Sequence, residues 1–167
     1  MTTPTSPSTI NAPWEGLALV VGAGGIGSAI ATHLAQRCPD LHVLTCGRTG
    51  VPDQDLTLNI EDDDSLSSFC ASVRQQGRPL RLVFNCSGRL HGPGLQPEKR
   101  LQQVNRRQLE EQFSINAIAP LLLAKAIEPM LNRHEAFHFA SLSARVGSIT
   151  DNRSGGWYGY RAAKAAQ

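Results

Sequence analysis

A short apolar run that ends in a cluster of glycines constrains the fold of this 167-residue chain more than any other feature. Residues 17–21 are continuously apolar, which is typical of a strand buried on both faces of a parallel sheet. Gly22, Gly24 and Gly27 follow at once in the spacing G-x-G-x-x-G, and an amphipathic stretch, 28–37, comes next. The order of strand, glycine turn and helix predicts the opening of a βαβ unit.

The rest of the chain continues this alternation. Apolar segments predict further strands at 41–46, 55–59 (weakly), 80–85 and 136–141. Helices are predicted at 28–37, 61–75, 105–131 and 158–167, the third interrupted by Pro120. We therefore expect an α/β fold, a doubly wound parallel sheet in three αβα layers. Residues 1–14, rich in Thr, Ser and Pro, are expected to form a disordered tail before a single domain, 15–167.

Composition argues against several classes of function. Lys plus Arg number 16 against 14 for Asp plus Glu, and 5% of residues are aromatic, so we expect no nucleic-acid partner. No apolar run approaches the length needed to span a bilayer, so we expect no membrane association. The four cysteines contain no C-x-x-C pair, which argues against a disulfide framework or a metal site and favours a cytoplasmic location.

The glycine turn predicts a dinucleotide site. Without side chains, the backbone can approach a pyrophosphate held at the helix N-terminus. The alternative is a tight structural turn that binds nothing. An acid about 20 residues past the motif would bind the ribose hydroxyls of NAD, whereas an arginine there would favour the phosphate of NADP. The sequence has Cys46-Gly47-Arg48 at this point, which favours NADP(H) over NAD(H) unless Arg48 is merely an exposed loop cation.

Near the C-terminus, Tyr160 and Lys164 lie four residues apart on a predicted helix. This spacing places the phenol and the ammonium group on one face. A nearby cation favours phenolate and is expected to lower the tyrosine pKa from about 10 toward working pH. The pair is therefore a candidate for transferring a proton to a substrate oxygen.

Taken in order, these motifs resemble the short-chain dehydrogenase/reductase family. They are the glycine turn, Asn85-Cys-Ser-Gly88, Asn116, the serines after 136–141, and Tyr160 with Lys164. Residues 143–160 are similar to the C-factor-like branch in particular. The resemblance implies a Rossmann-like domain and an NAD(P)-dependent oxidoreductase that reduces a small-molecule carbonyl or oxidises an alcohol. It also implies that helix 105–131 forms the face of a homodimer.

The resemblance also implies individual roles. Tyr160 would be the general acid, Lys164 would hold the nicotinamide ribose, and Asn116 would anchor a water molecule. A serine would hydrogen-bond the substrate oxygen. Ser143 is preferred over Ser141 for this role, and the third alternative is that neither serine has it. The implied cofactor-binding residues are Gly22, Gly24, Gly25, Ile26, Gly27, Arg48, Asn59, Ile60, Asn85, Ser87, Gly88, Tyr160 and Lys164.

Three departures from the family pattern keep other functions open. The glycine turn is one residue shorter than the family's G-x-x-x-G-x-G, and Asn59 stands where an aspartate usually contacts adenine. The family also continues past Lys164 with two further strands, which this sequence lacks. The alternatives are therefore a non-catalytic dinucleotide-binding sensor or signalling protein, and an inactive fragment of a longer reductase.

Overall fold

Five parallel strands form the centre of the molecule. The structure is a computed structural model that describes residues 14–48 and 54–167, so the expected tail lies outside the described residues except for Trp14. The strands are β1 (Gly16–Val21), β2 (Leu41–Gly47), β3 (Leu56–Thr57), β4 (Leu80–Asn85) and β5 (His138–Ser141). They lie in the order β3-β2-β1-β4-β5, and every neighbouring pair is parallel.

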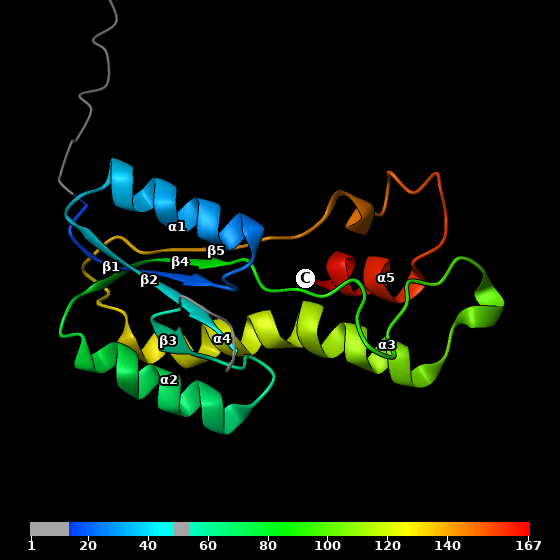
Figure 1. Ribbon diagram of the computed structural model, residues 1–167, viewed down its shortest axis with the longest axis horizontal. Helices are drawn as coiled ribbons and strands as arrows, with labels where there is room; N and C mark the ends of the chain where they lie inside the picture. The colour runs from blue at the N-terminus through cyan, green and yellow to red at the C-terminus, as the bar shows by residue number, and fades with distance from the viewer. Residues whose placement is uncertain (1–13, 49–53) are drawn as a thin grey trace, which may run out of the picture.

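Helices cover both faces of this sheet. They are α1 (Gly25–Arg37), α2 (Asp63–Gln75), α3 (Arg106–Phe113), α4 (Ala119–Ile127) and α5 (Tyr158–Ala166). Short 3₁₀ turns occur at Leu101–Gln103, Glu128–Met130 and Arg145–Gly147. Helix α1 lies on one face, and α2 and α4 lie on the other, while α3 and α5 extend beyond the ends of the strands (Figure 1). This arrangement confirms the expected doubly wound sheet in three layers.

The strand order creates a switch point beside β1. The chain moves outward from β1 to β2 and β3, and then returns to place β4 on the opposite side of β1. The connections after β1 and β4 therefore leave the sheet in opposite directions. Ligands of doubly wound sheets bind in the crevice that opens there, at the carboxyl ends of the strands.

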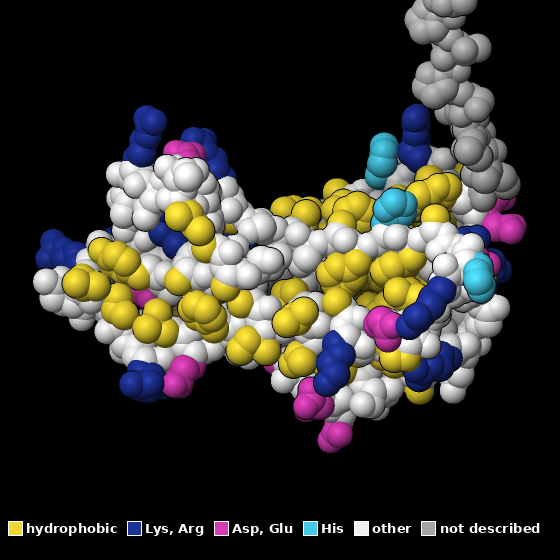
Figure 2. Space-filling model, turned by 180° about the vertical axis from the view of Figure 1, so that it is seen from behind, with side chains coloured by type: hydrophobic (Ala, Val, Ile, Leu, Met, Phe, Trp, Pro, Cys, Tyr) yellow, Lys and Arg dark blue, Asp and Glu magenta, His cyan; other side chains and the backbone are white. Residues whose placement is uncertain are grey.

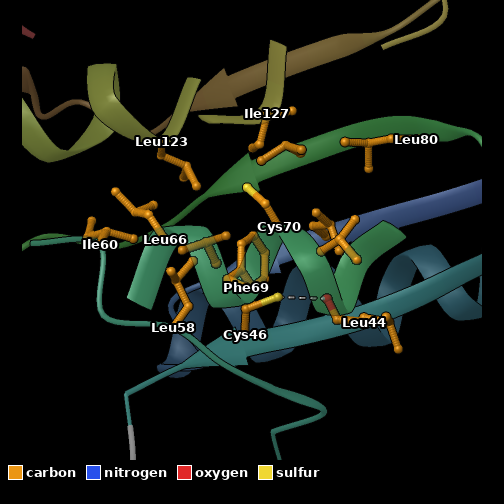
Figure 3. Packing of buried hydrophobic residues seen from close by; sticks show 14 of the residues in the cluster. Leu44, Cys46, Leu58, Ile60, Leu66, Phe69, Cys70, Leu80, Leu123 and Ile127 are labelled. Carbon is orange, nitrogen blue, oxygen red and sulfur yellow. Dashed lines mark hydrogen bonds between the residues drawn. The ribbon is translucent and has the colours of Figure 1, made fainter. Parts of the chain in front are cut away.

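The core divides into two layers because alternate residues of a strand face opposite sides of a sheet. All six residues of β1 are buried. Leu17 and Leu19 point toward α2 and α4, where Phe69 is the largest fully buried side chain (Figure 3). Ala18 points the other way, into a smaller cluster that includes Leu34 of α1. A strand without polar side chains fits only the centre of a sheet that is covered by helices on both faces.

The long helix expected at 105–131 is helical throughout most of its length but not uniform. A π-helical turn, Ser114–Ile118, separates α3 from α4. Pro120 does not end the helix, because it lies in the first turn of α4, where a missing N–H is tolerated. It cannot donate to the carbonyl four residues earlier, that of Asn116, which accounts for the wider turn at this point.

By length and composition alone, the helical stretch Arg106–Met130 could cross a membrane. Its most apolar window has a mean hydropathy of 1.2, and 28% of that window is buried. The stretch contains no unbroken apolar run of the required length, so the expectation of no membrane association stays a prediction. The stretch is apolar on two sides, since Leu123 and Ile127 pack into the core while Leu121 is 72% exposed. Interspersed polar residues such as Asn116 hide this length from a search for an unbroken apolar run.

Candidate functional site

A cavity of about 340 Å³ opens at the switch point of the sheet. The predicted cofactor residues that line it are Gly22, Gly24, Arg48, Asn59, Ile60, Ser87 and Gly88. Residues that sequence analysis did not single out also contribute, among them Cys86, Arg89 and Ile115. Because the lining comes from the ends of β1, β2 and β4, the fold gathers segments that lie far apart in the sequence.

The glycine turn forms one wall of this cavity, and its glycines are required for different reasons. Gly22 has φ 93°, and a Cβ there would lie 2.8 Å from the backbone nitrogen of Ser87. A Cβ on Gly27 would lie 2.0 Å from the carbonyl oxygen of Gly22, so α1 can approach β1 only without it. These two glycines therefore serve the protein's own packing.

Gly24 and Gly25 have no such requirement. A Cβ on either would meet nothing within 4 Å, and neither has positive φ. Gly24 nevertheless lines the cavity, and α1 begins at Gly25 without a side-chain cap. The open space and the uncapped N–H groups at a helix N-terminus fit the phosphates of a dinucleotide. The shortened glycine turn thus still lines a cavity at the start of an uncapped helix.

The charged side chains of the cavity have one sign. Among the described residues that line it, Arg48 and Arg89 are the charged ones, and no Asp or Glu takes part. Arg89 pairs through Nη2 with Oε1 of Glu111 at 2.8 Å. The one sequence feature that could have indicated Arg89 as a cavity residue is its position directly after Gly88. Glu111 offsets the charge of Arg89, so the field that favours an anionic ligand in this cavity comes mainly from Arg48.

Asn59 and Ile60 form the wall on the β3 side. The Asn59 Oδ1 accepts from the backbone nitrogen of Glu61 at 3.3 Å, and its own backbone nitrogen donates to Ser65 Oγ at 2.9 Å. Ile60 is buried against the core. Asn59 therefore lines the cavity with its side chain already engaged in a local turn.

Asn85 does not line the cavity, but its side chain holds together the strand ends next to it. Its Nδ2 donates to Ser141 Oγ at 3.0 Å, and its Oδ1 accepts from the backbone nitrogen of Ser87 at 3.1 Å. The fully buried side chain thus joins the end of β4 to the end of β5. Gly25, Ile26, Gly27, Tyr160 and Lys164, also predicted to contact cofactor, do not line it either.

Gly88 lies between the cavity and the Tyr–Lys helix. A Cβ at this position would lie 3.0 Å from Asn116 Oδ1 and 3.4 Å from Lys164 Nζ. Asn116, fully buried in the π-helical turn, donates to Arg89 O at 2.9 Å and accepts from Arg89 N at 3.0 Å. The structure therefore brings Asn116 and Lys164 together directly behind one wall of the cavity.

Lys164 is buried, and its ammonium group makes two hydrogen bonds. Its Nζ donates to Leu142 O at 2.9 Å and to Gln167 Oε1 at 2.7 Å. Gln167, which sequence analysis did not single out, also donates to Ser141 Oγ at 2.8 Å. Ser143 Oγ donates to the carbonyl oxygen of Lys164 at 3.1 Å. Both candidate serines thus belong to the network that seats α5.

The electrostatics of the pair differ from the expectation. Burial raises the pKa of the Tyr160 hydroxyl above its ordinary value and lowers the pKa of the Lys164 ammonium. The predicted lowering of the Tyr160 pKa is therefore wrong for the chain alone. The physical reason is that desolvation penalises phenolate, while the ammonium group is directed toward Leu142 and Gln167.

Comparisons with known proteins agree with these features. No family model matches the chain. It is 31% identical over 158 residues to 1-hydroxy-2-glutathionyl-2-methyl-3-butene dehydrogenase of Rhodococcus sp. (strain AD45), covering 89% of this chain and 65% of that protein. It is 36% identical over 66 residues to C-signal of Myxococcus xanthus, covering 40% of each. NADPH-bound carbonyl reductase from chicken fatty liver superposes with a TM-score of 0.75 at 25% identity, covering 91% of this chain and 66% of that one.

The direction of the Tyr160 pKa can be tested by alkaline titration of the Tyr158→Phe variant, which retains Tyr160 as its single tyrosine. Because burial favours the neutral phenol, we expect tyrosinate absorbance to develop with a midpoint above pH 10.0. A raised folded-state pKa also means that this group's stabilising contribution is present below the unfolded value and is lost as pH rises through the folded value. A midpoint at or below that of free tyrosine would contradict the assignment.

Proposed function

We propose that this chain, a member of the short-chain dehydrogenase/reductase family, is an NAD(P)-dependent oxidoreductase that interconverts a carbonyl and an alcohol. The observation that carries the proposal is the position of Gly88, which has the glycine-lined cavity on one side and Asn116 and Lys164 on the other. The Rhodococcus relative is named a dehydrogenase, and the chicken protein an NADPH-bound carbonyl reductase. Both names support oxidoreduction at a small-molecule substrate.

The residues of this chain divide the chemistry among them. A bound nicotinamide cofactor supplies the hydride acceptor or donor. Tyr160 donates a proton to the carbonyl oxygen as that oxygen gains charge during reduction. Its high pKa in the chain alone keeps this proton in place before reaction. Lys164 supplies positive charge on the same helix face, and Asn116 fixes the loop that carries Arg89.

The cofactor preferred by this site is NADP(H). Arg48 lies at the end of β2, where an acid would bind the ribose hydroxyls of NAD and repel an additional phosphate. The absence of Asp and Glu from the described lining of the cavity supports the same preference. The NADPH in the chicken carbonyl reductase is consistent with it.

Replacing Arg48 with Asp should reverse this preference. We expect the dissociation constant for NADPH to rise about 10- to 100-fold, the loss of roughly 1.5–3 kcal/mol carried by a hydrogen bond to a charged group. Affinity for NADH should be equal or higher. Fluorescence titration of both cofactors measures the change, and Arg133→Asp, at an 88% exposed side chain, is the matched charge control. Equal losses for NADPH and NADH would refute the phosphate role.

Tyr160→Phe should separate binding from catalysis. We expect NADPH oxidation in the presence of a panel of small aldehydes and ketones, benzaldehyde among them, to fall about 100- to 10,000-fold because the proton donor is lost. NADPH affinity should be unchanged. Tyr158→Phe, two residues away on the same helix, is the control and should retain activity. Full activity in Tyr160→Phe would overturn the assignment of Tyr160.

The activities of Ser143→Ala and Ser141→Ala, measured in the same assay, would identify which serine contributes to catalysis.

A second candidate function is a dinucleotide-binding protein without turnover. The specific observation that favours it is the engagement of Lys164 with Leu142 and Gln167, together with the raised Tyr160 pKa. The Myxococcus relative is named for a signal. NADPH binding by the wild-type chain with no turnover of any compound in the panel would favour this function over catalysis.

The chain forms a homodimer through α4. Ile118 and Leu121 lie three residues apart, and are 51% and 72% exposed. Apolar side chains also gather broadly over the rear face of the molecule (Figure 2). A helix face that is apolar in one copy can meet the same face of another across a two-fold axis. Such a partner would remove these side chains from water.

Leu121→Asp should weaken this dimer. We expect the dimer dissociation constant to rise at least about 10-fold, because each interface would bury two uncompensated charges. Sedimentation velocity across a concentration series measures the change. Leu101→Asp, at a similarly exposed leucine outside α4, is the control. A wild-type chain that stays monomeric, or a Leu121→Asp variant as dimeric as wild type, would contradict the proposal.

A further inference from the structure

Helix α5 carries Tyr160, yet its own N-cap residue cannot cap it. Trp157 occupies the N-cap position and makes no side-chain hydrogen bond to the helix. It also has φ 52°, the only positive φ among the non-glycine residues of the described chain. Bulky side chains disfavour this left-handed conformation, so it persists only where surrounding contacts enforce it. The first N–H groups of α5 therefore need acceptors from elsewhere in the fold.

Glu98 supplies these acceptors from the connection between β4 and α3. Its side chain is nearly fully buried, with 3% of the residue exposed. Its backbone carbonyl accepts from the backbone nitrogen of Trp157 at 2.5 Å. Its carboxylate Oε2 accepts from the backbone nitrogen of Gly159 at 3.4 Å. One residue thus contacts both the strained N-cap position and the second residue of α5.

The packing around Glu98 leaves little room for another arrangement. A Cβ on Gly159 would lie 3.1 Å from Glu98 Oε1, and one on Gly156 would lie 3.2 Å from the Glu98 carbonyl oxygen. The backbone of α5 therefore rests directly on Glu98. A carboxylate is also the group that the positive end of a helix dipole favours.

Tyr160 is the next residue after Gly159 and shares its helical turn. Its ring meets the ring of Trp157 edge to face, with centroids 6.5 Å apart. Whatever fixes Trp157 and Gly159 therefore fixes the direction from which the phenol projects. We propose that Glu98 is a positioning residue, which holds the first turn of α5 so that Tyr160 is aligned for proton transfer.

The inference rests on the proposed oxidoreductase function, and its test compares three variants of the full chain. Glu98→Ala removes the carboxylate, while Glu98→Gln keeps an oxygen that can accept from Gly159 N–H. Asp62→Ala is the matched control, because Asp62 caps α2 by accepting from Ser65 N at 2.8 Å and lies at a different helix. Activity is followed as NADPH oxidation with benzaldehyde or the most active compound of the panel.

We expect Glu98→Ala to lower kcat about 10- to 100-fold, since small displacements of a catalytic group carry penalties of this size. The KM for NADPH should be unchanged, because no part of Glu98 lines the cavity. Glu98→Gln should recover most of kcat. Asp62→Ala should lower thermal stability while leaving kcat at the wild-type value. Equal kcat for Glu98→Ala and wild type, or a loss in Glu98→Ala that matches Asp62→Ala in both stability and kcat, would overturn the inference.

A second readout requires no turnover. Hydrogen exchange at the amides of Gly159 and Tyr160 should be about 10-fold faster in Glu98→Ala, the change expected for loss of a helix cap, and unaltered in Asp62→Ala. A wild-type chain that reduces nothing, yet shows this acceleration in the variant, would contradict the proposed function and leave the alignment of the helix supported. Unchanged exchange would contradict the role of Glu98 itself, whatever the activity.

Discussion

The close contact between Gly27 and the carbonyl oxygen of Gly22 is the constraint on which the rest of the site depends. Because Gly27 has no Cβ, the first turn of α1 can lie against the end of β1. That approach leaves Gly22 and Gly24 in the cavity wall, beside the segments that follow β2 and β4. A methyl group at residue 27 would separate helix from strand and open the cavity wall.

The second half of the site depends on buried polar groups rather than on glycine. Asn85 joins β4 to β5 through Ser141, and Ser141 in turn receives Gln167, which accepts from Lys164. The side-chain amides of Asn85 and Gln167 and the ammonium group of Lys164 each have an acceptor here, so the network favours one arrangement of strand ends and helix. Lys164 donates to Leu142 and Gln167 in this network, while burial raises the Tyr160 pKa, the direction opposite to that predicted.

Local patterns predicted the sheet well, most clearly at β1, an apolar run that is buried throughout. The range of β4 agreed at both ends, and the glycine turn predicted the cavity wall that contains Gly24. Arg89, Glu98 and Gln167 were not predicted, since each acts through contacts with residues far away in the sequence, and no spacing rule links them. The interruption expected at Pro120 in the 105–131 helix was wrong in detail, because Pro120 lies in the first turn of α4 and the irregular turn comes before it, at Ser114–Ile118.

The strand order has a consequence for how the chain acquires this site as it is synthesised. The first residue of β1 pairs with Leu41, whereas the β4 partner of Leu17 is Leu80. One side of β1 can therefore be covered early, while the other side stays open until about twice as much chain has emerged. During that interval a strand with no polar residue presents an unpaired edge and an uncovered apolar face. The central position that lets β1 pair on both sides in the finished sheet therefore leaves it exposed to wrong pairing in the unfinished one.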